Sequence, residues 1–394
     1  MGAQEPFASL SQNRETGLRG LVRRMVRRAY SPEYTPPSFT QWFTTTNDQV
    51  EAISESDLSG AVAKTDPDLL LVVPTIIQRC DASEHAAQLQ DLLHQAAASE
   101  GHVAIVWGLQ GAEPAPLRQR IKEVTRQVKV PRGVTLICVM MSKGRKADTL
   151  NASFRVFAQS TYRAAGWIDD DVLLSEDCIP RLYARMVERQ FHGAVGPEKI
   201  AVKGDNTASR LLHRVKNITT PATNYPHGCC IIVERAIVQD GIPHRYTSDD
   251  GFVCFEVMER NLDNVPDSLE VFSGPWCKYV VGAPKGTNRA RIKRLLIDHW
   301  VFMCDYPVPV AQYYWANMLF AGFWPAGRMD LSNGIRFAAA KWALKLLYFG
   351  FICSVGVELF LRGVFNRPLG RVSWGGTKGK AYSPEAISAQ KQQT

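Results

Sequence analysis

Short apolar runs alternate with longer amphipathic stretches through the middle of the chain. The runs Leu69 to Val73, Val103 to Trp107 and Val134 to Met140 each predict a buried strand. Segments 84–99 and 116–129, which lie between these runs, predict helices. Strands that alternate with helices over short links predict a parallel sheet covered on both faces. Such sheets bind ligands at the carboxyl ends of their strands, so the functional residues are expected there.

A basic amphipathic pattern precedes this region. From Leu18 to Tyr30, apolar residues recur every three or four positions, and arginines fill the other face. The pattern predicts a short helix suited to an anionic bilayer surface, with a helix packed on the protein as the alternative. Residues 1–15 are expected to be disordered, and the Pro-, Ser- and Thr-rich stretch 32–46 to form a linker.

Two aromatic and apolar regions follow the predicted sheet. The region from Trp300 to Trp324 is interrupted by charge and prolines, so it is too broken to span a bilayer. Within 335–361, only Leu346 to Val357 is free of charge, which falls short of the ~20 apolar residues that a span needs. We expect this segment to lie in the plane of a membrane, with one short span as the alternative. The tail after Arg371 is expected to be flexible.

Composition narrows the class of protein. Of 394 residues, 45% are hydrophobic and 21% charged, which excludes disorder of the whole chain. The net charge of +8 is concentrated at the ends and favours anionic lipid as a partner. Nucleic acid is not expected, because no aromatic residues interleave with the basic ends to form a groove. The nine cysteines lack zinc spacing and predict reduced thiols. No signal peptide is evident, so we expect a cytosolic catalytic part.

Three consecutive aspartates lie between Gly166 and Val172, after an apolar Trp-Ile step. A strand that ends in acids places Asp169 and Asp171 on the same face. Two carboxylates held together suit Mg²⁺ or Mn²⁺, which keep their other positions for water and diphosphate oxygens. Such an ion would neutralise a departing diphosphate. A solvated acidic turn is the alternative.

A basic turn follows the third predicted strand. Lys143, Arg145 and Lys146 lie within four residues around Gly144, which allows a sharp turn, so the three cations are expected to converge on one anion. A helix is expected to begin near Ala147, and its N-terminus would favour an anion such as a diphosphate. A solvated basic turn is again the alternative.

A third group of polar residues follows a glycine-led apolar strand from His227 to Arg235. The sequence Thr247 to Asp250 then opens a predicted helix that runs through Arg260. A Thr or Ser before paired acids is a plausible helix cap. A carboxylate at that helix start could accept a proton from an incoming hydroxyl. Capping by Asp249 alone is the simpler interpretation.

Taken in this order, the three stretches resemble the family 2 glycosyltransferases of the GT-A fold over roughly residues 68–300. The stretch Ser142 to Asn151 looks like the family's lysine-rich donor loop, and Asp169 to Asp171 looks like its DxD metal motif. The strand from His227 resembles the acceptor-side strand. Ser248 to Asp250 is similar to the acidic pair that ends in the catalytic base.

A further element, Arg291 to Leu295, resembles the (Gln/Arg)-x-x-Arg-Trp motif of membrane-bound members. The resemblance implies an α/β fold of GT-A type around a central, mostly parallel sheet, with membrane-associated helices at the termini. The chain then divides into a basic N-terminal segment, a catalytic domain, membrane-associated helices and a tail: 1–67, 68–300, 301–366 and 367–394. The implied roles are catalytic for Asp250 and Asp249, donor-binding for Lys143, Lys146, Asp169, Arg291 and Arg294, and metal-binding for Asp169 and Asp171.

The sequence departs from the family pattern at two places. Where the family has an acid after its second strand, this chain reads Trp107 to Gly111, and Asp81 lies too early to replace that acid. The final Trp of the last motif is replaced by Leu295, and Trp300 could compensate only if the helix turns it toward the acceptor. The motifs therefore do not assign residues to the nucleotide base or to the acceptor.

The expected activity is inverting transfer of a sugar from a nucleotide-sugar donor to a lipid or glycan acceptor at the cytosolic membrane face. A UDP-sugar is the expected donor. Mn²⁺ or Mg²⁺ is the expected cofactor. A processive polysaccharide synthase is the alternative within the enzyme class, although such enzymes carry several membrane spans. A scaffold protein that kept the fold without activity is the alternative from another class, and the intact acids Asp169, Asp171 and Asp250 argue against it.

Overall fold

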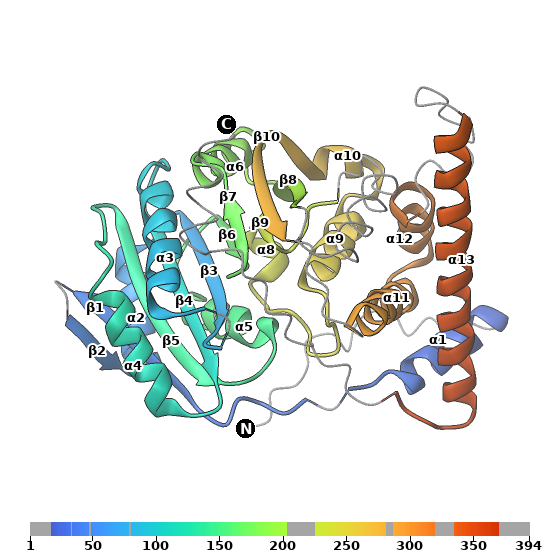
Figure 1. The fold of residues 1–394 in the computed structure, drawn as a ribbon, viewed down its shortest axis with the longest axis horizontal. Helices are drawn as coiled ribbons and strands as arrows, with labels where there is room; N and C mark the ends of the chain where they lie inside the picture. The colour runs from blue at the N-terminus through green and yellow to red at the C-terminus, as the bar shows by residue number, and fades with distance from the viewer. Residues whose placement is uncertain are drawn as a thin grey trace.

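A computed structural model describes residues 17–32, 34–46, 49–78, 80–202, 225–280, 287–319 and 335–369. The protein is a mixed α/β fold built on one ten-stranded sheet with the order β2-β1-β5-β4-β3-β6-β9-β8-β10-β7 (Figure 1). The strands are β1 Thr40–Thr46, β2 Gln49–Ile53, β3 Leu69–Ile76, β4 Val103–Gly111, β5 Val134–Ser142, β6 Ala164–Ile168, β7 Val172–Leu174, β8 Ala194–Val202, β9 Cys230–Glu234 and β10 Leu269–Val280.

Helices cover the sheet and extend beyond it on one side. In chain order, they are α1 Leu18–Ala29, α2 Glu55–Thr65, α3 Ala82–Ala97, α4 Pro114–Thr125, α5 Lys146–Val156, α6 Cys178–Glu188, α8 Arg235–Val238, α9 Asp249–Arg260, η2 Leu262–Asn264, α10 Val265–Ser268, α11 Thr287–Asp305, α12 Val308–Tyr313, the π-helical turn η3 Tyr314–Leu319 and α13 Ile335–Val364.

The centre of the sheet is parallel, as the alternating pattern predicts. Strands β5, β4, β3 and β6 run in the same direction, and antiparallel strands flank them on both sides. The predicted strands at 69–73, 103–107 and 134–140 and both helices between them are confirmed, each within a few residues of its observed ends. The parallel strands therefore bring the ends of β3, β4, β5 and β6 to one edge of the sheet.

The predicted linker is wrong over its last part. Residues 40–46 form β1, which pairs with β5 through contacts such as Trp42 with Val139 and continues into the hairpin partner β2. Trp42 is buried and Phe43 nearly so, and these two side chains anchor an otherwise threonine-rich strand. Pairing with β5 gives the polar strand its hydrogen bonds, which the local composition does not reveal.

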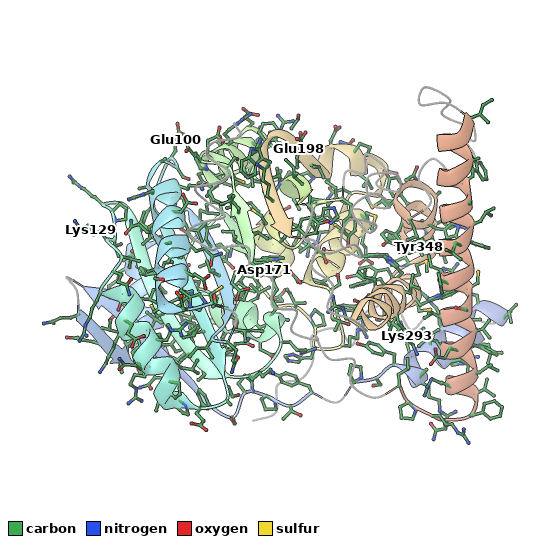
Figure 2. All side chains as sticks on the ribbon, viewed as in Figure 1. Glu100, Lys129, Asp171, Glu198, Lys293 and Tyr348 are labelled. Carbon is green, nitrogen blue, oxygen red and sulfur yellow. The ribbon has the colours of Figure 1, made fainter. Side chains whose placement is uncertain are left out.

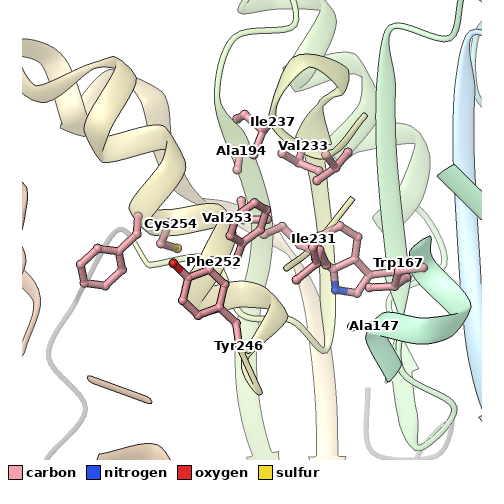
Figure 3. Packing of buried hydrophobic residues seen from close by; sticks show 14 of the residues in the cluster. Ala147, Trp167, Ala194, Ile231, Val233, Ile237, Tyr246, Phe252, Val253 and Cys254 are labelled. Carbon is pink, nitrogen blue, oxygen red and sulfur yellow. The ribbon is translucent and has the colours of Figure 1, made fainter. Parts of the chain in front are cut away.

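Two hydrophobic clusters occupy the two faces of the sheet. One includes α3, α4 and α6, and the other joins the sheet to α5, α9 and α11. In the second cluster, Trp167 of β6 lies close to Ala147 of α5 and Ile231 of β9, with Phe252 and Val253 of α9 beyond them (Figure 3). The strand and helix starts that carry the polar residues of interest are thus fixed by one shared core.

The N-terminal and C-terminal helices pack on one another. Val26 and Ala29 of α1 are buried against this part of the protein, and Arg27 pairs with Asp305 at 2.9 Å. A Cβ on Gly363 of α13 would lie 2.1 Å from the Met25 carbonyl oxygen, so glycine allows the two helices to cross closely. The predicted helix at 18–30 is confirmed, and the alternative of a helix packed on the protein describes its apolar face.

Helix α13 lies along one side of the molecule and presents two unlike faces (Figure 1). Its inner face packs on the domain through Ile352, Val355 and Leu359, which are buried. We call the opposite side the outer face of α13; its large apolar residues are all about half exposed, namely Leu346, Leu347, Phe351, Val357, Leu361 and Val364. Within the described part of the chain, one segment, Leu346–Val364, is long and apolar enough to cross a membrane by length and composition.

Candidate active site

The three aspartates after β6 divide into one structural residue and two that face outward. Asp170 is buried and accepts a hydrogen bond from the backbone N–H of Ile76 at 3.0 Å, so it joins the end of β6 to the end of β3. Asp169 and Asp171 remain partly exposed on either side of it. Asp171 lies near the middle of the molecule, between the sheet and the helical layer (Figure 2). This division follows the alternation predicted from the sequence.

Lys146, the first residue of α5, connects two of the predicted groups. Its Nζ lies 2.7 Å from Asp169 Oδ1 and 2.9 Å from Asp249 Oδ2, and it donates a hydrogen bond to the Gly228 carbonyl oxygen at 2.6 Å. Burial alone would lower the pKa of Lys146, but the charges of Asp169 and Asp249 outweigh it and raise the pKa above its ordinary value. Lys146 is therefore an ammonium that holds together the end of β6, the residues that lead into β9 and the start of α9.

Asp249 is the more buried member of the acidic pair. Burial raises its pKa to about 6, and neighbouring Asp250 and Asp169 act in the same direction, while Lys146 opposes them. The helix cap is Ser248, whose hydroxyl oxygen accepts the Gly251 N–H at 3.1 Å. The prediction that the Ser or Thr before the acids caps α9 is confirmed, whereas Asp249 is the partner of Lys146 rather than the cap.

Asp250 points to a different set of partners. It accepts hydrogen bonds from the Ser248 hydroxyl, from the Gly228 N–H at 3.1 Å and from the Gly251 N–H at 2.9 Å. Burial alone would raise its pKa, but the Ser248 hydrogen bond, nearby His227 and the Gly228 N–H together lower the pKa below its ordinary value. Asp250 is thus an ionised carboxylate at neutral pH, less buried than Asp249.

Gly228 packs closely against both acids of the pair. Its N–H binds Asp250 and its carbonyl binds Lys146. A Cβ at this position would lie 2.8 Å from Asp249 Oδ2 and 3.2 Å from Asp250 Cβ. Glycine is required here because any side chain would push the acidic pair away from the strand. The sequence signalled this position only through the glycine that opens the apolar strand.

The three cations of the basic turn do not converge as predicted. Lys146 reaches the acids, but the Arg145 guanidinium turns to the carbonyl oxygen and ring of His244 and to Asp148, 3.6 Å away. Lys143 has an exposed side chain. Local spacing placed three charges within one turn, and the start of α5 sends their side chains in different directions.

Gln110, which the sequence reading missed as a functional residue, shapes this turn. Its amide donates to the Arg145 carbonyl oxygen at 2.9 Å and to Thr149 at 2.8 Å, and its oxygen accepts the Gly144 N–H at 3.1 Å. Gln110 lies at the end of β4, in the stretch where the resemblance implied an acid and the chain has none. Asp81, the other position considered for that role, caps α3 together with Glu84. An amide at the end of a buried strand is the one signal that could have indicated Gln110.

Helix α11 carries the last predicted motif. Burial raises the pKa of Asp298, one turn later, and the charge of Arg294 opposes that rise. The side chain of Arg291 lies outside the described residues. Trp300 donates from its indole to the Ile352 carbonyl oxygen at 2.8 Å and packs on Gly356, so it docks α13 instead of compensating for Leu295.

Asp298 was also missed, and its burial yields a pH prediction. It is 4% exposed and accepts the Thr247 hydroxyl at 2.5 Å. Burial raises its pKa to about 7, against the Thr247 hydrogen bond and the charge of Arg294. Because this pKa exceeds the unfolded value of about 3.9, the native state favours the protonated acid, and stability is lost as the pH rises toward 7.

Asp298→Asn should remove that loss while keeping an oxygen for the Thr247 hydroxyl. Between pH 5 and pH 8, the unfolding free energy of the natural protein should fall, relative to the variant, by up to about 3 kcal/mol. Urea unfolding of both proteins at the two pH values measures the difference. Equal losses in both proteins would show that Asp298 titrates in the native state as it does when unfolded.

The ligand set predicted for a metal consists of two carboxylates. Among the residues that the structure describes, no three His, Cys, Asp or Glu side chains gather into a metal-binding group. Mg²⁺ is commonly held by one or two carboxylates together with substrate phosphates, and Asp169 and Asp171 provide that number. The ammonium of Lys146 at 2.7 Å from Asp169 acts as a stand-in cation and indicates that a positive charge is favourable there. The residues therefore fit an ion that arrives with a diphosphate.

No family model matches the sequence, and neither does any curated protein. The fold is similar to that of the mannosyltransferase PcManGT from Pyrobaculum calidifontis in complex with GDP-Man and Mn²⁺, with 15% identity, a TM-score of 0.45, and coverage of 89% of this chain and 94% of that one.

It is also similar to S. aureus TarS 1–349 in complex with UDP-GlcNAc, with 10% identity, a TM-score of 0.42, and coverage of 76% of this chain and 88% of that one. Both neighbours are complexes with a nucleotide-sugar.

Proposed function

We propose that the protein is a metal-dependent, inverting glycosyltransferase of GT-A type that takes its sugar from a nucleotide-sugar donor. A UDP-sugar is the donor that we propose. The observation that carries the proposal is the meeting of three distant segments on Lys146. The first segment is the start of α5, which carries Lys146. The second follows β6 and carries Asp169, and the third is the start of α9 at Asp249. A lysine, two outward carboxylates and a separate ionised acid are the groups that transfer from a diphosphate donor requires.

The proposed mechanism assigns one task to each group. Asp169 and Asp171 would hold the divalent ion, which supplies positive charge to the departing diphosphate. Lys146 would add a further charge on that side, and Lys143, Arg291 and Arg294 are the other donor-side cations of the proposal. Asp250 would accept the proton of the acceptor hydroxyl, with Asp249 beside it to fix the acidic segment. A single displacement from the face opposite the nucleotide would invert the anomeric centre.

A donor screen tests the proposal directly. Purified full-length protein is incubated with Mn²⁺ or Mg²⁺ and common nucleotide-sugars, and release of nucleoside diphosphate is measured with lipid-linked and glycan acceptors. We expect release with one donor class and a strong dependence on acceptor. A folded protein that binds no donor and releases no nucleotide would instead support the scaffold alternative. Polymer formation from one donor would support the processive synthase.

We propose that the protein meets its acceptor at a membrane surface. The outer face of α13 carries six large apolar side chains that are about half exposed, and α1, which packs on α13 near Gly363, carries exposed arginines, Arg19 and Arg24 among them. Apolar and cationic groups side by side suit an anionic bilayer, into which α13 would sink in the plane. Its inner face is docked on the domain by Tyr348, Trp300 and the pair of Lys293 with Glu358 at 2.8 Å, which favours in-plane insertion over a span.

Replacing two leucines on the outer face should weaken this binding. In Leu347→Ser/Leu361→Ser, each site loses about half of a leucine's transfer free energy, so affinity for anionic vesicles should fall on the order of 30-fold. Vesicle co-sedimentation measures the change. The matched control is Val130→Ser/Val187→Ser, because these valines are 40% and 41% exposed on the catalytic part. Equal effects of the two double variants, or no binding of the natural protein to the vesicles, would contradict the membrane proposal.

A further inference from the structure

Lys146 occupies the position that a divalent ion would take on Asp169. Its Nζ is 2.7 Å from Asp169 Oδ1, and the side chain is only 15% exposed. Asp249 and the Gly228 carbonyl hold the ammonium on its other sides, at 2.9 Å and 2.6 Å. A Mg²⁺ ion binds its oxygens at about 2.0–2.1 Å, so an ion on the same carboxylate would lie within a few ångströms of the ammonium.

Resting on the proposed function, we propose that Lys146 and the divalent ion compete for Asp169, so that the ion binds tightly only when a diphosphate draws Lys146 away. Two cations a few ångströms apart in a partly buried site repel one another strongly, and little water is present to screen them. The ion alone must displace the ammonium and leave it without its partners. A nucleoside diphosphate changes this balance because its oxygens offer Lys146 new anionic partners.

The other charges around the ammonium support the exchange. Lys146 is the cation paired with both Asp169 and Asp249, and Asp249 is the more deeply buried of the two, with its side chain 8% exposed against 27% for Asp169. The ammonium therefore has a second, more buried anionic partner in Asp249, which still holds it if it leaves Asp169. It can leave Asp169 for a diphosphate on the donor side while the backbone of α5 stays in place, because lysine carries a long flexible stem. Lys146 is thus a positioning residue that makes metal binding depend on the donor.

This competition has a thermodynamic consequence. In the natural protein, nucleotide and metal help one another for two reasons, namely their direct contact and the release of Lys146 from Asp169. Without the ammonium only the direct contact remains, so the coupling between nucleotide and metal becomes smaller. Removal of Lys146 should therefore tighten binding of the metal alone, although it removes a donor-side charge.

The test measures Mn²⁺ binding to full-length protein by electron paramagnetic resonance, alone and with UDP or GDP. Lys146→Met should bind Mn²⁺ alone about 10-fold more tightly or better than the natural protein, which is the scale on which a charge acts on a neighbouring carboxylate. Lys146→Arg restores the positive charge and should return the weak binding. Lys143→Met is the matched control, since it removes the same charge from the same turn at an exposed side chain.

Circular dichroism checks that each variant folds, and Lys146→Gln replaces the methionine variant if that one does not. The competition is overturned if the neutral variant binds Mn²⁺ alone no more tightly than the natural protein, or if Lys143→Met has an equal effect. Either result, obtained with a natural protein that still transfers sugar, leaves the proposed function standing. Absence of Mn²⁺ binding in every variant, with and without nucleotide, overturns both the competition and the metal dependence.

Discussion

Removal of divalent ions by a chelator should abolish sugar transfer, and added Mn²⁺ or Mg²⁺ should restore it. The same loss is expected from Asp171→Asn, because a diphosphate leaving group needs several kcal/mol of charge stabilisation that two carboxylates and an ion would supply. We expect transfer to fall by roughly 10³-fold in this variant. Nucleoside diphosphate release measures the rate, and circular dichroism follows the fold.

Asp170→Asn is the control within the same triplet. Asp170 is buried and accepts the Ile76 N–H, and asparagine keeps an oxygen for that bond. Its transfer rate should therefore fall much less than that of Asp171→Asn. Full activity in chelator, or equal losses in both variants, would contradict the assignment of Asp171 to the metal.

The sequence was most informative where local pattern and tertiary environment agree. The buried strands of the parallel centre are short apolar runs, and α9 begins at a Ser followed by two acids, so both could be predicted from neighbouring residues. The strand β1 could not, because its threonine-rich residues are stabilised by pairing with β5, nearly a hundred positions away. Pairing over that distance leaves little trace in local composition.

The site was predictable as a set of segments but not as a set of contacts. Asp169, Asp249 and Lys146 were all identified, yet their meeting depends on how β6, α5 and α9 share one core. Arg145 was expected to face the same ligand and instead pairs with Asp148 and His244. Which way a side chain leaves a helix start depends on φ and ψ at one or two residues, and spacing along the chain does not determine them.

The same limit applies to the end of the catalytic part. Trp300 was considered as a replacement for the motif's missing tryptophan, but it docks α13, where Gly356 leaves room for its ring. That contact joins residues more than fifty positions apart. A glycine inside an apolar helix is a weak signal by itself, and its meaning becomes clear only when the partner ring is known.

The two acids at the start of α9 should have different roles, one in proton transfer and the other in donor binding. Asp250→Asn should reduce the rate of transfer by ~10²–10⁴-fold, the usual contribution of a general base. Affinity for nucleoside diphosphate with metal should change little, because Asp250 accepts hydrogen bonds from Ser248, Gly228 and Gly251, whereas the ammonium of Lys146 pairs with Asp169 and Asp249. Single-turnover rates and nucleotide binding measured on the same preparation give both quantities.

Asp249→Asn should show the opposite division. It removes the buried partner of Lys146, 2.9 Å away, so the ammonium is no longer held in place for the donor. We expect weaker nucleotide binding and a raised KM for the donor, with a smaller loss in the rate of transfer than in Asp250→Asn. If Asp249→Asn abolishes transfer while Asp250→Asn leaves it intact, the base is Asp249, whose pKa of about 6 already suits proton transfer near neutral pH. If both variants keep full activity, the start of α9 is not the catalytic site.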